Sequence, residues 1–149
     1  MSHRTTIMAA LRLSTAAGNE RVAMAAAAAA GRLAGLSPER LADLRTVVAE
    51  ACLNAFEHGN SNRPDLPVYL TFTSRAGGFR VLVRDRGPGF QLAGPTPPSL
   101  EYLLAGGSSG RGWGLWLIKQ LADRVQVRQN RRGCSVILDF NLEDEVTAS

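Results

Sequence analysis

Several features that mark common functional classes are scarce or missing in this chain. Only two of its 149 residues are cysteines, and the distance between Cys52 and Cys134 fits neither a zinc site nor a redox pair. No segment approaches the ~20 consecutive apolar residues of a membrane span, and the N-terminus has no apolar run followed by a small-residue cleavage site. The sequence therefore predicts two buried thiols, a cytoplasmic location and no membrane partner.

Two widespread nucleotide-binding motifs are also absent. The sequence G-x-x-x-x-G-K-[ST] does not occur, and the order of the expected elements does not fit a Rossmann unit. The formal net charge is +4, but the arginines are scattered along the chain, and no aromatic stacking platform or recognition-helix signature accompanies them. We therefore expect no direct nucleic-acid partner.

Composition and length indicate one globular domain over residues 1–149. The chain is 45% hydrophobic and 20% charged, which is ordinary for a folded protein and leaves no room for a second domain. Apolar periodicity and turn residues predict the elements in order. These are an edge strand at 7–14, a helix at 20–33, a central helix from 38 to about 57, strands at 68–74 and 79–85, a long Pro- and Gly-rich segment at 91–109, a helix at 112–122, strands at 125–129 and 134–141, and a frayed tail at 142–149.

This order predicts an α+β fold, a two-layer sandwich in which helices cover one face of a mixed, mostly antiparallel sheet. Asn19 is the expected N-cap of the first helix. Ser37 as N-cap and Pro38 at the first helical position should start the central helix.

The central helix has an unusual polar stripe. Glu50, Asn54 and His58 are spaced four residues apart, so a regular helix places them on one face. A carboxylate can polarise an attacking hydroxyl, and an amide carbonyl one turn away can bind Mg²⁺ as a hard oxygen ligand. Taken alone, however, the same spacing is also typical of a solvated helix face. We interpret His58 as a helix-end residue that bonds to a nearby loop.

Two glycine-rich turns follow downstream. The first, in VRDRGPGF, comes directly after a strand whose apolar alternation places Asp85 toward the interior. The second, in GGSSGRGWGLWL, precedes an apolar helix whose N-terminal N–H groups could hold a phosphate. Glycines let a backbone approach a ligand closely. An aspartate that merely caps a turn is the alternative for a lone D-x-G sequence.

Three motifs in this order, E-A-x-x-N-A-x-x-H-G, D-x-G-x-G and G-x-G-x-G-L, resemble the GHKL (Bergerat) ATPases. The resemblance is closer to the bacterial anti-sigma-factor serine/threonine-protein kinases, and it covers most of the chain. It implies a histidine-kinase-like ATPase fold with an ATP lid at about 91–111. It also implies that Glu50 is the catalytic base and that Asn54 is the Mg²⁺ ligand. The ATP-binding residues that it implies are Asn54, Asp85, Gly87, Gly89, Gly110, Arg111, Gly112, Gly114 and Leu115.

The resemblance also implies a function and partners. Such kinases use ATP and Mg²⁺ to phosphorylate a small antagonist protein, sequester a sigma factor and usually pair as homodimers. The carboxylate that matches Asp85 accepts a hydrogen bond from the adenine amino group. This chain departs from the pattern in its lid, which has no clear acidic-basic pattern for substrate contact, while Arg111 lies inside the last glycine run.

Two other functions compete with a kinase. The first is a nucleotide-gated regulator that binds its partner without phosphotransfer, although a pure binder has no need of a base at Glu50. The second is a basic nucleic-acid-binding domain, which only the pI of about 9.8 favours. The kinase is the preferred interpretation.

Overall fold

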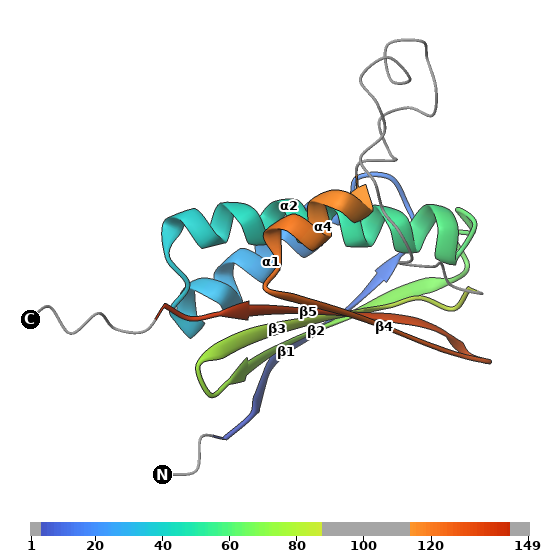
Figure 1. Cartoon of the computed structure of the whole chain (residues 1–149). Coiled ribbons are helices and arrows are strands. Elements are labelled where there is room, and N and C mark those ends of the chain that lie inside the picture. Colours follow the sequence, from blue (N-terminus) through green and yellow to red (C-terminus); the bar gives the residue numbers. More distant parts are fainter. Residues whose placement is uncertain (1–3, 88–113, 144–149) are drawn as a thin grey trace, which may run out of the picture.

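A five-stranded sheet forms one layer of the molecule, and the helices cover one of its faces (Figure 1). The computed structural model describes residues 4–87 and 114–143. The strands lie in the order β1-β2-β3-β5-β4. Every strand pair among the described residues is antiparallel, and the predicted two-layer α+β fold is confirmed. The strands are β1 (Thr6–Ser14), β2 (Pro67–Arg75), β3 (Gly78–Arg84), β4 (Arg124–Asn130) and β5 (Gly133–Asn141).

Alternation of apolar residues decides which face of the sheet the helices cover. In β2, Val68, Leu70 and Phe72 are fully buried, as their spacing predicts. The register aligns Phe72 with Val81 of β3, and Val81 with Leu138 of β5, so apolar rows run across the sheet beneath the helices. The residues between them, such as Tyr69, lie on the opposite face, which the described helices leave uncovered.

The helical layer consists of α1 (Asn19–Ala34), α2 (Pro38–Asn54) and α4 (Gly114–Leu121), with a short π-helical turn η1 (Ala55–Gly59) directly after α2. The predicted start of α2 is confirmed, because the Ser37 hydroxyl accepts a hydrogen bond from the Arg40 N–H at 3.3 Å. The alanine-rich helix α1 packs on α2, and its residues Ala23, Ala27 and Ala30 belong to the buried core. Among the described residues, no helix is long and apolar enough to cross a membrane.

The start of α1 differs from the prediction that Asn19 is its N-cap. Gly18 occupies the cap position with φ 97°, a conformation that glycine adopts without strain, and Asn19 is the first helical residue. The Asn19 side-chain amide instead donates to the Ser14 carbonyl at 2.8 Å. Its side chain therefore forms a hydrogen bond with a carbonyl at the end of β1 and does not cap the helix.

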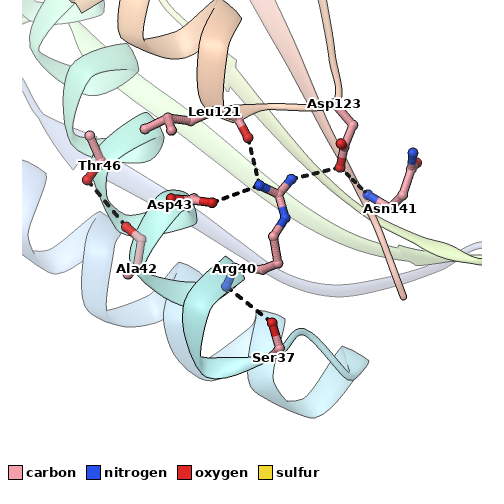
Figure 2. Close-up of polar contacts among 8 residues, drawn as sticks. All are labelled: Ser37, Arg40, Ala42, Asp43, Thr46, Leu121, Asp123 and Asn141. Carbon is pink, nitrogen blue, oxygen red and sulfur yellow. Dashed lines mark hydrogen bonds and ion pairs between the residues drawn. The ribbon is translucent and has the colours of Figure 1, made fainter. Parts of the chain in front are cut away.

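Arg40 joins the two helices that carry the predicted site residues (Figure 2). From the first turn of α2, its guanidinium donates to Asp43 at 2.8 Å, to the Leu121 carbonyl at 2.9 Å and to Asp123 at 2.7 Å. The guanidinium carbon also lies 4.9 Å from the centre of the Phe140 ring. These contacts fix the C-terminal end of α4 beside the N-terminal end of α2, so the two helices lie antiparallel.

Candidate functional site

Three predicted site residues lie together where the C-terminal end of α2 meets the N-terminal end of α4. Asn54, in the last turn of α2, is only 3% exposed, and Glu50 is half-buried one turn before it. Gly114, the first residue of α4, lies against both: a Cβ at this position would come within 2.6 Å of Glu50 Oε2 and 3.7 Å of Asn54 Nδ2. The absence of a side chain at this position thus leaves room for the Glu50 carboxylate beside the backbone of α4. Leu115 follows it and is half-buried.

The regular helix ends at Asn54, earlier than the sequence predicts. From Ala55 to Gly59 the chain forms a π-helix, in which the Asn60 N–H donates to the Ala55 carbonyl at 2.8 Å. A π-turn takes more residues than an α-turn and interrupts the four-residue spacing. His58 is exposed while Asn54 is buried, so the predicted stripe is confirmed for Glu50 and Asn54 but not for His58. Such turns are frequent at functional sites.

Asp85 forms the second part of the site, directly after β3. Its side chain is buried, at 2% exposure, as the alternation of β3 predicts. The carboxylate accepts hydrogen bonds from the Gly87 N–H at 2.8 Å and the Cys134 N–H at 3.3 Å. Burial raises the pKa of Asp85, and these two hydrogen bonds offset only part of that increase. A buried carboxylate held by backbone donors is a preorganised acceptor for a polar ligand.

Glycine backbones enclose this carboxylate. A Cβ on Gly59 would overlap the carboxyl oxygen of Asp85, and a Cβ on Gly87 would overlap the Gly59 carbonyl. Since η1 begins next to Asn54 and ends at Gly59, this one turn connects the two parts of the site. Gly87 was predicted to bind the ligand. Gly59 was not, although it is the final glycine of the E-A-x-x-N-A-x-x-H-G motif.

Asn60, directly after η1, supports the site through hydrogen bonds and was not predicted as a site residue from the sequence. Its side chain is 1% exposed and donates to Thr15 Oγ1 at 3.0 Å and to the Pro67 carbonyl at 3.1 Å. Its carbonyl oxygen accepts from the Arg86 N–H at 2.8 Å. Asn60 therefore ties the residue after Asp85 to the end of β1 and the start of β2.

The other predicted ligand-binding residues, Gly89, Gly110, Arg111 and Gly112, lie outside the described residues, as does the predicted lid at 91–111. Within 4–87 and 114–143, no group of three or more His, Cys, Asp or Glu side chains is placed to hold a metal ion. Cys52 and Cys134 are both fully buried, as predicted, and burial raises the pKa of Cys52 to about 12.

Comparison with known proteins identifies the family of the chain. Residues 13–140 match the family described as the histidine kinase-like ATPase domain. The chain belongs to this family.

Curated relatives cover most of the chain. The serine-protein kinase RsbW of Bacillus subtilis is 32% identical over 119 residues, which are 74% of this chain and 71% of the relative. The anti-sigma F factor of Oceanobacillus iheyensis is 28% identical over 140 residues, which are 92% of this chain and 95% of the relative. The family and these relatives together imply that the chain binds ATP.

Among solved structures, the histidine kinase domain of the blue-light activated histidine kinase EL346 from Erythrobacter litoralis has the same fold. The TM-score is 0.52 with 24% sequence identity, and the match covers 70% of this chain. This chain spans 45% of the length of that structure. The likeness confirms the histidine-kinase-like fold.

Proposed function

We propose that this protein binds Mg·ATP and phosphorylates a serine or threonine of a small antagonist protein, and that a sigma factor is its second partner. The observation that supports this best is the contact of Gly114 with Glu50 and Asn54, which places the start of α4 beside an acid and an amide. The names of the relatives, a serine-protein kinase and an anti-sigma factor, support the reaction and the partners. We further propose that the protein acts in the cytoplasm and as a homodimer. Light scattering of the purified protein would test the dimer.

The residues fit the nucleotide. Asp85 is buried, accepts hydrogen bonds and has glycine backbones around it, which suits the recognition of an adenine amino group. Asn54 offers an amide carbonyl one helical turn from Glu50. A single protein oxygen suits Mg²⁺, which keeps most of its waters and is commonly completed by phosphate oxygens. When bound, Mg·ATP would supply the phosphoryl group and neutralise its charge.

Glu50 has the role that separates a kinase from a binder. Its carboxylate lies beside Gly114, the first residue of α4, and the positive end of a helix dipole favours an anion nearby. A carboxylate there can accept the proton of a serine or threonine hydroxyl as the hydroxyl attacks. General bases typically contribute ~10²–10⁴-fold to a rate and little to ground-state binding.

The test is phosphorylation of candidate antagonist proteins with labelled ATP by the wild type, Glu50→Gln and Glu39→Gln. Glu39 is exposed in the first turn of the same helix, so its variant controls for the change of charge. Glu50→Gln should bind ATP and the partner almost normally, while phosphorylation falls by ~10²-fold or more. Glu39→Gln should remain active.

A second candidate is a nucleotide-gated regulator that binds its partner without phosphotransfer, which the anti-sigma factor relative favours by name. The same assay separates the two functions. If the wild type binds a partner in an ATP-dependent manner but phosphorylates none, or if Glu50→Gln is as active as the wild type, the kinase proposal fails.

A further inference from the structure

A depression in the surface lies near the Asp85 end of the sheet. It has a volume of about 550 Å³ and is lined by Leu66, Arg84, Arg86 and Arg132. Arg84 and Arg86 stand on either side of Asp85 in the chain, but their side chains are exposed whereas that of Asp85 is buried. Arg132 comes from the β4–β5 hairpin turn, where its N–H donates to Asn130 Oδ1 at 2.8 Å. We call these four residues the arginine pocket.

More positive charge lies beside the arginine pocket on the helix-free face of the sheet. The register aligns Arg12 of β1 with Tyr69 of β2, and Tyr69 with Arg84 of β3. Arg86 donates to the Tyr69 hydroxyl at 3.0 Å, and its guanidinium carbon lies 5.7 Å from the ring centre. Hydrogen bonds from Arg86 and Arg12 lower the pKa of Tyr69. Residues far apart in the sequence thus form one basic patch.

The two ends of this face differ in how their arginines are compensated. At the far end, Asp139 of β5 pairs with Arg80 at 2.7 Å and with Arg75 at 3.4 Å. In the described residues, no carboxylate forms an ion pair with Arg84, Arg86 or Arg132. Like charges that converge on a depression repel one another, and an anionic ligand would relieve that repulsion.

We propose that the arginine pocket binds an acidic segment of a protein partner through carboxylate or phosphoryl oxygens. Guanidinium groups bind such oxyanions in a planar, two-pronged manner, and Leu66 offers an apolar contact to the same segment. A nucleic acid fits less well, because Arg86 covers the ring of Tyr69, the aromatic side chain beside the pocket, so a base cannot stack on that face. This site is distinct from the nucleotide site and does not depend on phosphotransfer.

The experiment measures binding of three fluorescent probes at an ionic strength of about 0.15 M. The probes are a short oligo-glutamate peptide, the same peptide with one phosphoserine, and a single-stranded oligothymidine of equal net charge. The double variant Arg84→Gln/Arg132→Gln removes two guanidinium groups from the pocket. The matched control, Arg32→Gln/Arg45→Gln, removes two exposed arginines from the helical layer. Thermal melting verifies that each variant is folded, and Mg·ATP affinity verifies the nucleotide site.

We expect the wild type to bind an acidic peptide, and the pocket variant to bind it at least about tenfold more weakly. The control should bind almost as the wild type does. Arg84→Lys/Arg132→Lys should restore only part of the affinity, because lysine keeps the charge but not the two-pronged geometry. Whichever acidic peptide binds more tightly identifies the preferred oxyanion.

Three results would overturn the proposal. The wild type could fail to bind either peptide, the pocket and control variants could lose affinity equally, or oligothymidine could bind at least as tightly as the peptides. The last result would assign this face to nucleic acid. A failure of the kinase assay would leave this test unaffected, since the probes need neither ATP nor phosphotransfer.

Discussion

Gly114 lies against the carboxylate of Glu50, so closely that a Cβ at position 114 would come within 2.6 Å of Oε2. The atom in the way is the far end of a flexible side chain, which can rotate without disturbing the backbone. The contact therefore restricts the position of Glu50 more than it stabilises the fold.

Gly114→Ala should accordingly displace the Glu50 carboxylate and lower phosphorylation of the partner by about tenfold or more, while the free energy of unfolding changes by about 1 kcal/mol or less. Initial rates and urea unfolding would measure the two effects. If the loss arises through Glu50, adding Gly114→Ala to Glu50→Gln should cause little further loss. A fully active Gly114→Ala enzyme would contradict this role of the contact.

Asn54 should bind Mg²⁺ through its side-chain carbonyl. A cation that bridges protein and phosphates is worth several kcal/mol, so Asn54→Ala should weaken Mg·ATP binding by at least about tenfold. Asn54→Asp keeps an oxygen at the same place and should retain most of the Mg²⁺-dependent affinity. Calorimetry with Mg²⁺ and with a chelator would measure both variants. Unchanged Mg·ATP affinity in a folded Asn54→Ala protein would rule out this ligand.

Asp85 should select the base of the nucleotide. GTP presents a carbonyl where ATP presents an amino group, and loss of a hydrogen bond to a charged acceptor costs about 1.5–3 kcal/mol. We therefore expect the wild type to bind ATP at least about tenfold more tightly than GTP. Asp85→Asn, which replaces the acceptor by an amide, should narrow this difference. Equal affinity of the wild type for the two nucleotides, measured by calorimetry, would contradict the assignment.

The buried Asp85 carboxylate also predicts a dependence of stability on pH. Burial raises its pKa above the usual 3.8, so just above pH 3.8 the folded state holds this proton more firmly than the unfolded state does. The contribution of Asp85 to stability is therefore greatest at low pH and is lost as pH rises through its folded pKa. Relative to Asp85→Asn, the wild type should lose stability as pH increases across this window. Urea unfolding of both proteins at several pH values would measure this change. If neighbouring groups stabilised the charged carboxylate instead, the wild type would gain stability relative to Asp85→Asn as pH increases.

Much of the fold follows from local patterns in the sequence. Val68, Leu70 and Phe72 alternate as a strand covered on one face must, and Ser37 with Pro38 begins α2 as helix-start residues should. The same alternation places the Asp85 side chain in the interior at the end of β3. These features depend on residues that are close together in the chain, which is why periodicity and capping rules predict them.

The support of the site depends on distant residues and could not be predicted in this way. Asn60 bonds to Thr15, 45 positions away, and this contact turns a loop residue into a buried scaffold. Local sequence rules also do not predict the η1 turn, because its last residue, Gly59, packs against the Asp85 side chain, which is distant in the chain. The cluster of positive charge at the arginine pocket also could not be predicted, because the arginines that form it are scattered along the sequence.

Arg40 should control the position of α4, and its contact with Leu121 joins residues 81 positions apart. The guanidinium is one-fifth exposed and satisfies the last carbonyl of the helix as well as Asp43 and Asp123. Arg40→Ala removes a donor from each of these groups, of which Asp123 keeps the hydrogen bond from the Asn141 N–H at 2.7 Å. The variant should lower the free energy of unfolding by about 2–3 kcal/mol.

Because the opposite end of α4 begins at Gly114, beside Glu50, the same variant should also weaken Mg·ATP binding at a temperature where it remains folded. Arg40→Lys keeps one charge but cannot reach all three acceptors, so it should recover only part of both properties. Arg45→Ala, an exposed arginine on the same helix, is the control and should change neither. Calorimetry and thermal melting of the three variants would decide the matter. If Arg40→Ala loses stability but binds Mg·ATP as the wild type does, Arg40 stabilises the fold without positioning the nucleotide site.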